Sequence, residues 1–172
     1  MAIQIRPLRK KDNRKEFKSR QAQLDRFFHR YASQNQFRHN IGVTYIATDE
    51  ESIYGYVTVA TGSIEKEILP KGSKLPRNYP LPILRLGRMA VDARYQGQGI
   101  GKMLLRYVFL LALKQKELVG CVGIVVDAKQ EAIAFYQKYG FQMLSKIVEG
   151  EVKGHPSSIP MFLSIKSIPA LA

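Results

Sequence analysis

A glycine-rich turn is the part of the sequence whose residue types and spacing best suit chemistry. Residues 96–102 read QGQGIGK and precede a long stretch with helical character. Glycine has no Cβ, so the alternating glycines allow successive backbone N–H groups to face a ligand. A helix that begins here adds about half a positive charge at its N-terminus. The turn is therefore predicted to bind a phosphate group.

Two common nucleotide-binding motifs do not fit this turn. A P-loop would need glycine at position 96 and serine or threonine at position 103, where the chain has Gln96 and Met103. A dinucleotide-binding fingerprint would need glycine at position 102, where the chain has Lys102. The pattern that remains is Q-x-x-G-x-G, formed by Gln96, Gly99 and Gly101.

Two further segments resemble the same family as the turn does. Residues 88–92 (RMAVD) come directly before it, and residues 132–141 (AIAFYQKYGF) follow the next predicted strand. Together these motifs resemble the GNAT superfamily of N-acetyltransferases, and the flanking strands extend the likeness over nearly the whole chain. The resemblance implies an α+β (α/β/α layered) GNAT fold with a mixed, mostly antiparallel sheet of six to seven strands and flanking helices.

The resemblance also implies an acetyl-CoA site. The main-chain N–H groups of the turn would hold the pyrophosphate, with the Lys102 side chain as an added charge, and the preceding strand would pair with the pantetheine arm through its backbone. The expected cofactor-binding residues are Met89, Ala90, Val91, Gln96, Gly97, Gln98, Gly99, Ile100, Gly101 and Lys102. No metal site is expected, because the single cysteine and the three histidines have no ligand spacing.

Tyr136 is the expected catalytic residue. A phenol with an ordinary pKa of about 10 is protonated at pH 7 and can donate to the thiolate of departing CoA, the role that the resemblance implies. The alternative is an aromatic side chain that packs the second long helix against the sheet. No carboxylate stands out as a general base. An α-amine, with a pKa of about 8, needs none when an adjacent ester lowers that pKa further, whereas a lysine side chain would usually need one.

A narrower resemblance is to the acetyltransferase toxins of type II toxin–antitoxin pairs. Residues 86–92, 95–101 and 126–129 carry it, and residues 24–28, 34–36 and 44–47 are similar to the amino-terminal part of those toxins. The chain departs from their Phe-x-Cys/Ser-Gly signature, because residues 17–20 read FKSR. The expected function is transfer of acetyl from acetyl-CoA to the α-amino group of aminoacyl-tRNA, which would inhibit translation. The alternatives are acetylation of a small amine or protein amino terminus, and a non-catalytic role in an antitoxin–DNA complex.

The net charge of +13 is concentrated in two regions. The first forty residues carry eleven bases and three acids, and residues 81–120 carry seven bases and two acids. Phosphates of CoA account for part of the second region but not for the first, so a polyanion such as tRNA is expected to bind. The candidate contacts are Arg26, Arg30, Arg85 and Arg88, with further basic residues Lys10, Lys11, Arg14, Lys15, Lys71, Lys74 and Arg77. An acidic antitoxin segment or simple solubility would also explain the charge.

The elements that must position these residues can be predicted from hydrophobic spacing. A first strand ends at Pro7, and Leu24, Phe27, Phe28 and Tyr31 have the spacing of one helix face. We further expect strands over residues 42–47, 53–62, 83–91, 119–126, 141–148 and 158–168, and helices over 99–118 and 129–139, the last ended by Gly140. A single domain, 1–172, is expected.

The remaining expectations concern partners and location. With no apolar leader and no stretch of the ~20 residues that cross a bilayer, the chain is expected in the cytoplasm, without membrane association. Cys121 is expected to be a small buried residue rather than a nucleophile. A ribbon-helix-helix antitoxin and a second copy of the chain are partners that the family resemblance leaves open.

Overall fold

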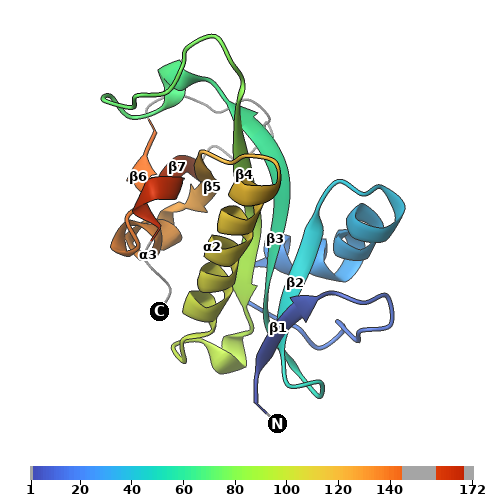
Figure 1. Ribbon diagram of the computed structural model, residues 1–172. Coiled ribbons are helices and arrows are strands. Elements are labelled where there is room, and N and C mark those ends of the chain that lie inside the picture. The colour runs from blue at the N-terminus through green and yellow to red at the C-terminus, as the bar shows by residue number, and fades with distance from the viewer. Residues whose placement is uncertain (1, 145–157, 169–172) are drawn as a thin grey trace. The chain divides into compact units, whose positions relative to one another are not determined.

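Seven strands form one sheet in the order β1-β2-β3-β4-β5-β7-β6 in the computed structural model, which describes residues 2–144 and 158–168 (Figure 1). The strands are β1 (Gln4–Pro7), β2 (Val43–Thr48), β3 (Ile53–Ile64), β4 (Leu81–Val91), β5 (Gly123–Lys129), β6 (Gln142–Met143) and β7 (Ser158–Ser164), and the α-helices are α1 (Ala22–Arg26), α2 (Ile100–Leu118) and α3 (Ile133–Lys138). The pairs β1/β2, β2/β3, β5/β7 and β6/β7 are antiparallel. The predicted α+β sheet of six to seven strands is confirmed. No described helix is both long and apolar enough to cross a membrane.

The chain divides into two compact units. The first consists of Met1–Ala60 with Leu86–Leu110, and the second of Thr61–Arg85 with Leu111–Ala172. A single domain over 1–172 stays a prediction.

The core of the first unit is rich in aromatic rings. Phe28 and Tyr56 are both fully buried and stack with their ring centroids 4.4 Å apart. The Tyr56 hydroxyl donates to the Leu24 carbonyl at 2.7 Å, so the helical segment is fastened to the sheet by a hydrogen bond as well as by packing. Stacked and buried rings of this kind stabilise a core beyond the apolar area that they remove from water.

The core of the second unit lies around β5 and β7. Val125 and Phe162 are buried opposite each other in the antiparallel ladder. A Cβ at Gly123 would meet the Leu163 carbonyl oxygen at 2.3 Å, so only glycine fits at this close approach. Cys121 is buried beside it and its Sγ donates to the Gly123 carbonyl at 3.2 Å, which confirms the expectation of a buried cysteine. Burial raises the pKa of this thiol.

Two sequence expectations about elements are wrong. Tyr31 does not share the buried face of Leu24, Phe27 and Phe28 but is 42 % exposed. The reason is that Phe27–Tyr31 and Gln34–Arg38 are π-helical turns, whose wider spacing moves position i+7 away from that face. The fifth strand begins at Gly123, not at Val119, because Val119 follows the end of α2 and is 77 % exposed.

Most of the other predicted elements agree with the structure to within a few residues. The last strand ends at Ser164 rather than at residue 168, because Ile165–Ser167 form a 3-10 turn, and the predicted helix over 129–139 consists of a 3-10 turn, Gln130–Ala132, followed by α3. β4 and α2 cover the predicted segments 83–91 and 99–118. Gly140 follows α3 with a φ of +97°, as expected for a glycine that ends a helix. The predicted strand over 141–148 is present as the short β6, and residues 145–148 lie outside the described residues.

Candidate functional site

The predicted phosphate-binding turn lies directly before α2 in the first unit. Gly97 and Gly99 have φ values of +78° and +85°, a conformation that glycine adopts without strain. No atom lies within 4 Å of where a Cβ would stand at either position. Gly97, Gln98, Gly99 and Lys102 are all exposed. The turn is therefore open to solvent and lies at a helix N-terminus, which favours negative charge. Its residues fit the pyrophosphate of acetyl-CoA.

Side chains behind the turn hold it in place. The Gln96 side-chain amide donates to the carbonyls of Ser19 and Val91, each at 3.1 Å. The Gln96 side chain is therefore engaged in hydrogen bonds within the fold, so any contact of Gln96 with CoA would come from its backbone.

Asp92 is a structural residue that the sequence reasoning did not single out. It is only 1 % exposed and accepts hydrogen bonds from the backbone N–H groups of Lys18 and Arg94, at 3.2 and 2.9 Å, and from the Arg94 guanidinium at 3.0 Å. Burial acts to raise the pKa of Asp92, but these hydrogen bonds outweigh it and the net pKa is lowered. A charged Asp92 joins the residues before the turn to the segment around Lys18.

The expected pantetheine-binding residues end strand β4. Ala90 is buried, and Met89 and Val91 are half-buried. A Cβ at Gly55 would meet the Ala90 carbonyl oxygen at 2.9 Å, so the backbones approach closely here. Pairing of these residues with a pantetheine arm stays a prediction.

Tyr136 lies on α3 in the second unit. Its side chain is 4 % exposed and packs edge-on against Phe135 and Phe141, with ring centroids 5.3 Å away in both cases. Burial raises the pKa of Tyr136 above its ordinary value, so the phenol keeps its proton at neutral pH. This environment is compatible with both interpretations of Tyr136, as an aromatic residue that packs the helix and as a protonated donor. The catalytic role stays a prediction.

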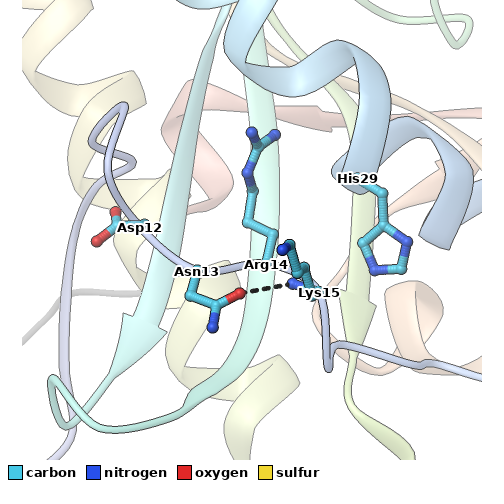
Figure 2. Close-up of a pocket in the computed structure, with 5 residues that line it drawn as sticks. All are labelled: Asp12, Asn13, Arg14, Lys15 and His29. Atoms are coloured by element: carbon cyan, nitrogen blue, oxygen red, sulfur yellow. Dashed lines mark hydrogen bonds between the residues drawn. The ribbon is translucent and has the colours of Figure 1, made fainter.

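Three hollows with basic linings lie on the first unit. The first, of about 400 Å³, is lined by Asp12, Asn13, Arg14, Lys15 and His29 (Figure 2). The second, about 630 Å³, is lined by Lys15, Glu16, Lys18, Arg20, Asp92, Ala93 and Arg94. The third, about 790 Å³, is lined by Lys18, Arg20, Ala22, Asp25, Arg26, His29 and Arg30. Because they share lining residues, the hollows adjoin, and we call Lys15, Lys18, Arg20, Arg26, Arg30 and Arg94 the basic surface.

The four predicted RNA-contacting arginines differ in their surroundings. Arg26 and Arg30 are exposed and belong to the basic surface. Arg88 is half-buried and lies over the Phe27 ring, 4.0 Å from its centroid, and burial lowers its pKa. Arg85, in the second unit, forms an ion pair with Asp127 at 3.2 Å. Arg26 and Arg30 are the two whose side chains face solvent.

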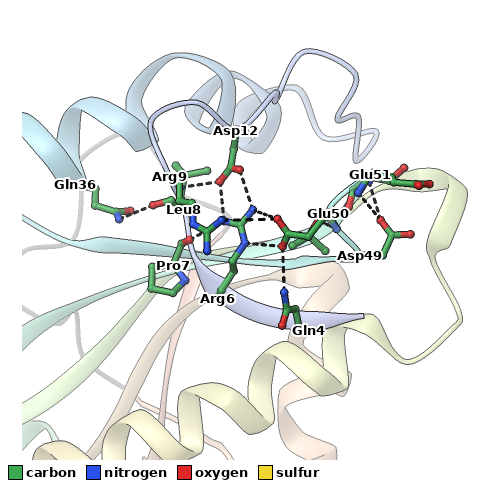
Figure 3. A network of polar contacts seen from close by, with 12 residues as sticks. Gln4, Arg6, Pro7, Leu8, Arg9, Asp12, Gln36, Asp49, Glu50 and Glu51 are labelled. Carbon is green, nitrogen blue, oxygen red and sulfur yellow. Dashed lines mark hydrogen bonds and ion pairs between the residues drawn. The ribbon is translucent and has the colours of Figure 1, made fainter. Parts of the chain in front are cut away.

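A network around Arg6 fixes the segment that leads to the basic surface. Figure 3 shows the Arg6 guanidinium between two carboxylates, 2.9 Å from Asp12 and 2.9 Å from Glu50. Gln4 adds a hydrogen bond to Glu50 at 3.1 Å. The network ties β1 and the residues after it to the turn between β2 and β3, so Asn13, Arg14 and Lys15 follow a well-anchored backbone.

Comparison with known proteins gives one family. The family described as acetyltransferase (GNAT) domain matches residues 40–143. A tRNA-acetylating toxin of Mycobacterium tuberculosis (strain ATCC 25618 / H37Rv) is 27% identical over 128 residues, which cover 74% of this chain and 76% of that protein.

Solved structures are similar over almost the full length. A tyrosine-to-phenylalanine mutant of KacT has a TM-score of 0.82 and 25% identity, with 97% of each chain covered. AtaT complexed with acetyl-methionyl-tRNAfMet has a TM-score of 0.80 and 27% identity, with 96% of each chain covered.

Proposed function

Because the chain belongs to the acetyltransferase (GNAT) family, we propose that it transfers the acetyl group of acetyl-CoA to the α-amino group of aminoacyl-tRNA. The observation that carries the choice of acceptor is the likeness, over 96% of this chain, to AtaT solved with acetyl-methionyl-tRNAfMet. The tRNA-acetylating relative supports the same acceptor. Arg26 and Arg30 on the basic surface suit a substrate with a phosphate backbone.

The turn before α2 binds the cosubstrate in this proposal. The N–H groups of residues 97–102 and the Lys102 ammonium hold the pyrophosphate, and Met89, Ala90 and Val91 hold the pantetheine arm. Acetyl-CoA supplies an acetyl thioester that a neutral amine can attack. No metal takes part in the proposed reaction.

Tyr136 supplies the proton that the leaving group needs. When the amine attacks the thioester carbon, the C–S bond breaks and the sulfur leaves as a thiolate. The Tyr136 phenol, which burial keeps protonated, donates its proton to that thiolate. The amine needs no protein base before the attack, because an adjacent ester lowers the pKa of an α-amine and an appreciable fraction is neutral at pH 7. As the amide forms, the nitrogen loses a proton to solvent, and the Tyr136 phenolate regains its proton from solvent, so the phenol is restored.

The proposed acceptor can be tested directly. The purified protein is incubated with labelled acetyl-CoA and total aminoacyl-tRNA, and the aminoacyl moieties are released by mild alkali and analysed by mass spectrometry. We expect N-acetylaminoacyl products, and no label on deacylated tRNA. Label on free amines or on peptide amino termini, with none on aminoacyl-tRNA, would support the small-amine or protein alternative instead. No acetylation of any acceptor would favour the non-catalytic alternative.

The proposed function carries a partner and a location with it. Aminoacyl-tRNA is used in the cytoplasm, so the chain is proposed to act there. The resemblance to toxins of type II toxin–antitoxin pairs, together with a relative named as a toxin, supports a protein antitoxin as a second partner. Purification from cells that also express the neighbouring reading frame would show such a partner as a co-eluting small protein.

A further inference from the structure

We propose that Arg20, with Lys15 and Lys18, forms a phosphate-binding subsite for the RNA substrate. This inference rests on the proposed function and adds to it a specific site for one stretch of the RNA backbone. Three observations carry it: the backbone conformation of Arg20, the way neighbouring carboxylates are used, and the position of these cations in the hollows.

The backbone of Arg20 has an unusual conformation for its residue type. Its φ is +74°, in the left-handed region where a side chain crowds its own backbone and where glycine is favoured. The Arg20 side chain is exposed and forms no hydrogen bond or ion pair with any described residue. An arginine that strains the backbone and has no polar partner within the described residues is not explained by hydrogen bonds or ion pairs of the fold, which points to a ligand outside the chain.

The two residues that precede Arg20 are held in place by hydrogen bonds. The Lys18 N–H donates to Asp92 and the Lys18 carbonyl accepts from the Ala93 N–H at 2.8 Å. The Ser19 N–H donates to Asp25 at 2.9 Å and the Ser19 carbonyl accepts from Gln96. With every backbone polar group of two preceding residues bonded, Arg20 is presented in a fixed position rather than on a loose loop.

The carboxylates of the second and third hollows do not neutralise these cations. Asp25 accepts hydrogen bonds from the Ser19 N–H and hydroxyl, the latter at 2.6 Å, and Asp92 accepts from two backbone N–H groups and Arg94. Glu16, the remaining carboxylate of these two hollows, is exposed and forms no ion pair with a described residue. Across residues 2–144 and 158–168, no carboxylate oxygen lies within 4 Å of the charged groups of Lys15, Lys18 or Arg20. Their positive charge is therefore left for an external anion.

Lys15, Lys18 and Arg20 line adjoining hollows, so successive phosphates of one polymer could contact them. Lys15 lines the first and second hollows, and Lys18 and Arg20 line the second and third. A polymer with one phosphate per nucleotide can place successive charges in adjoining hollows, and a guanidinium can bind one phosphate through two hydrogen bonds. An RNA backbone has this chemistry.

Replacement of Arg20 by glycine separates a binding role from a folding role. In Arg20→Gly the strain is relieved, so the melting temperature is expected to be at or above that of the wild type. Affinity for deacylated tRNA at about 0.1 M salt is expected to fall roughly five- to tenfold, and the slope of log Kd against log salt to fall by about one. Arg20→Lys, which keeps the charge, should keep the slope.

Two matched controls accompany this variant. Asn40→Gly relieves another left-handed residue, with φ of +55°, without a change in charge. Lys116→Ala removes one exposed charge from α2. Both are expected to bind tRNA like the wild type.

The outcomes are distinguishable. If the wild type acetylates aminoacyl-tRNA and Arg20→Gly binds tRNA with unchanged affinity and slope, the subsite is wrong while the proposed function stands. If Arg20→Gly loses thermal stability together with acetyl-CoA binding, Arg20 is structural and the inference also fails. Weaker binding of a poly-glutamate peptide, with tRNA binding unchanged, would assign the site to an acidic protein segment instead of RNA. Absence of acetylaminoacyl products from the wild type would contradict the proposed function itself.

Discussion

At the residue scale, the proposed proton transfer depends on the Tyr136 hydroxyl. Tyr136→Phe removes that oxygen and leaves the ring between Phe135 and Phe141, so folding should be preserved. Loss of a general acid typically slows the chemical step by about a hundredfold to ten-thousandfold. We expect kcat to fall by this amount while the Kd for acetyl-CoA, measured by calorimetry, stays within about twofold of the wild type. Unchanged turnover would show that another group protonates the thiolate.

The types of the site residues could be predicted from the sequence, but their side-chain partners could not. Arg85 and Arg26 are both arginines in basic stretches, and the sequence gives no reason to separate them. The structure separates them because Asp127, 42 residues further along the chain, pairs with Arg85, whereas Arg26 faces solvent. Gln96 is a similar case, since its carbonyl partner Ser19 lies 77 residues away. Contacts between distant segments depend on the fold, and local spacing does not encode them.

At the element scale, a substitution of Gly99 in the turn before α2 should act through backbone strain rather than through a steric clash. A Cβ at Gly99 meets no atom within 4 Å, but the φ of +85° costs any other residue about 1 to 2 kcal/mol. In Gly99→Ala we expect the KM for acetyl-CoA to rise on the order of tenfold, because the altered turn no longer presents its N–H groups correctly. Gly72→Ala is the matched control, since Gly72 has a φ of +96° and equally open space. It should lose similar stability with an unchanged KM, and an equal rise in KM for both variants would contradict a role of this turn in binding.

The connection through Asp92 should make stability depend on pH. The net pKa of Asp92 is lowered in the folded state, so its charged form stabilises the fold above the unfolded value of about 3.9, and this stabilisation is lost as pH falls through the folded pKa. In Asp92→Asn we expect a loss of about 1 to 3 kcal/mol at pH 7 and a smaller further loss between pH 5 and pH 2 than in the wild type. Urea unfolding across this range measures both quantities. Arg94→Gln, which keeps the carboxylate, should give an intermediate loss, and a pH profile of Asp92→Asn parallel to the wild type would remove Asp92 as the cause.

Elements with strong local signals were the ones that the sequence predicted well. The bounds of α2 follow from its glycine turn and its apolar spacing, and both are local. The helical segment after Gln21 was predicted less well, because the 3.6-residue period assumes α-helical turns and cannot reveal the π-helical turns that expose Tyr31. The start of β5 was missed for a related reason. Val119 is apolar like the strand residues, and only the end of α2 shows that it belongs to the connection.

At the scale of the whole molecule, the excess of positive charge has a structural explanation in the first unit. Counting charges along the chain predicted that the first forty residues would attract a polyanion. The structure adds that two of the three acids among these residues are used internally, with Asp12 bound to Arg6 and Asp25 bound to Ser19, while Glu16 is exposed. Apart from Arg94, which pairs with Asp92, the cations of the basic surface form no ion pair with a described residue and remain available for a ligand. The net charge alone would have been compatible with simple solubility.

This distinction predicts different effects for two double variants with the same change in net charge. Wild-type affinity for tRNA is expected to fall at least tenfold between about 50 and 200 mM salt, because each phosphate contact releases counterions. Arg26→Glu with Arg30→Glu reverses two charges of the basic surface and should weaken tRNA binding strongly and lower the log–log salt slope by about two, while the KM for acetyl-CoA changes little. Lys114→Glu with Lys116→Glu reverses two exposed charges on α2 and should leave most of the binding intact. Equal loss in both double variants would mean that tRNA responds to net charge alone, since a surface with defined phosphate contacts must distinguish where on the molecule the charges lie.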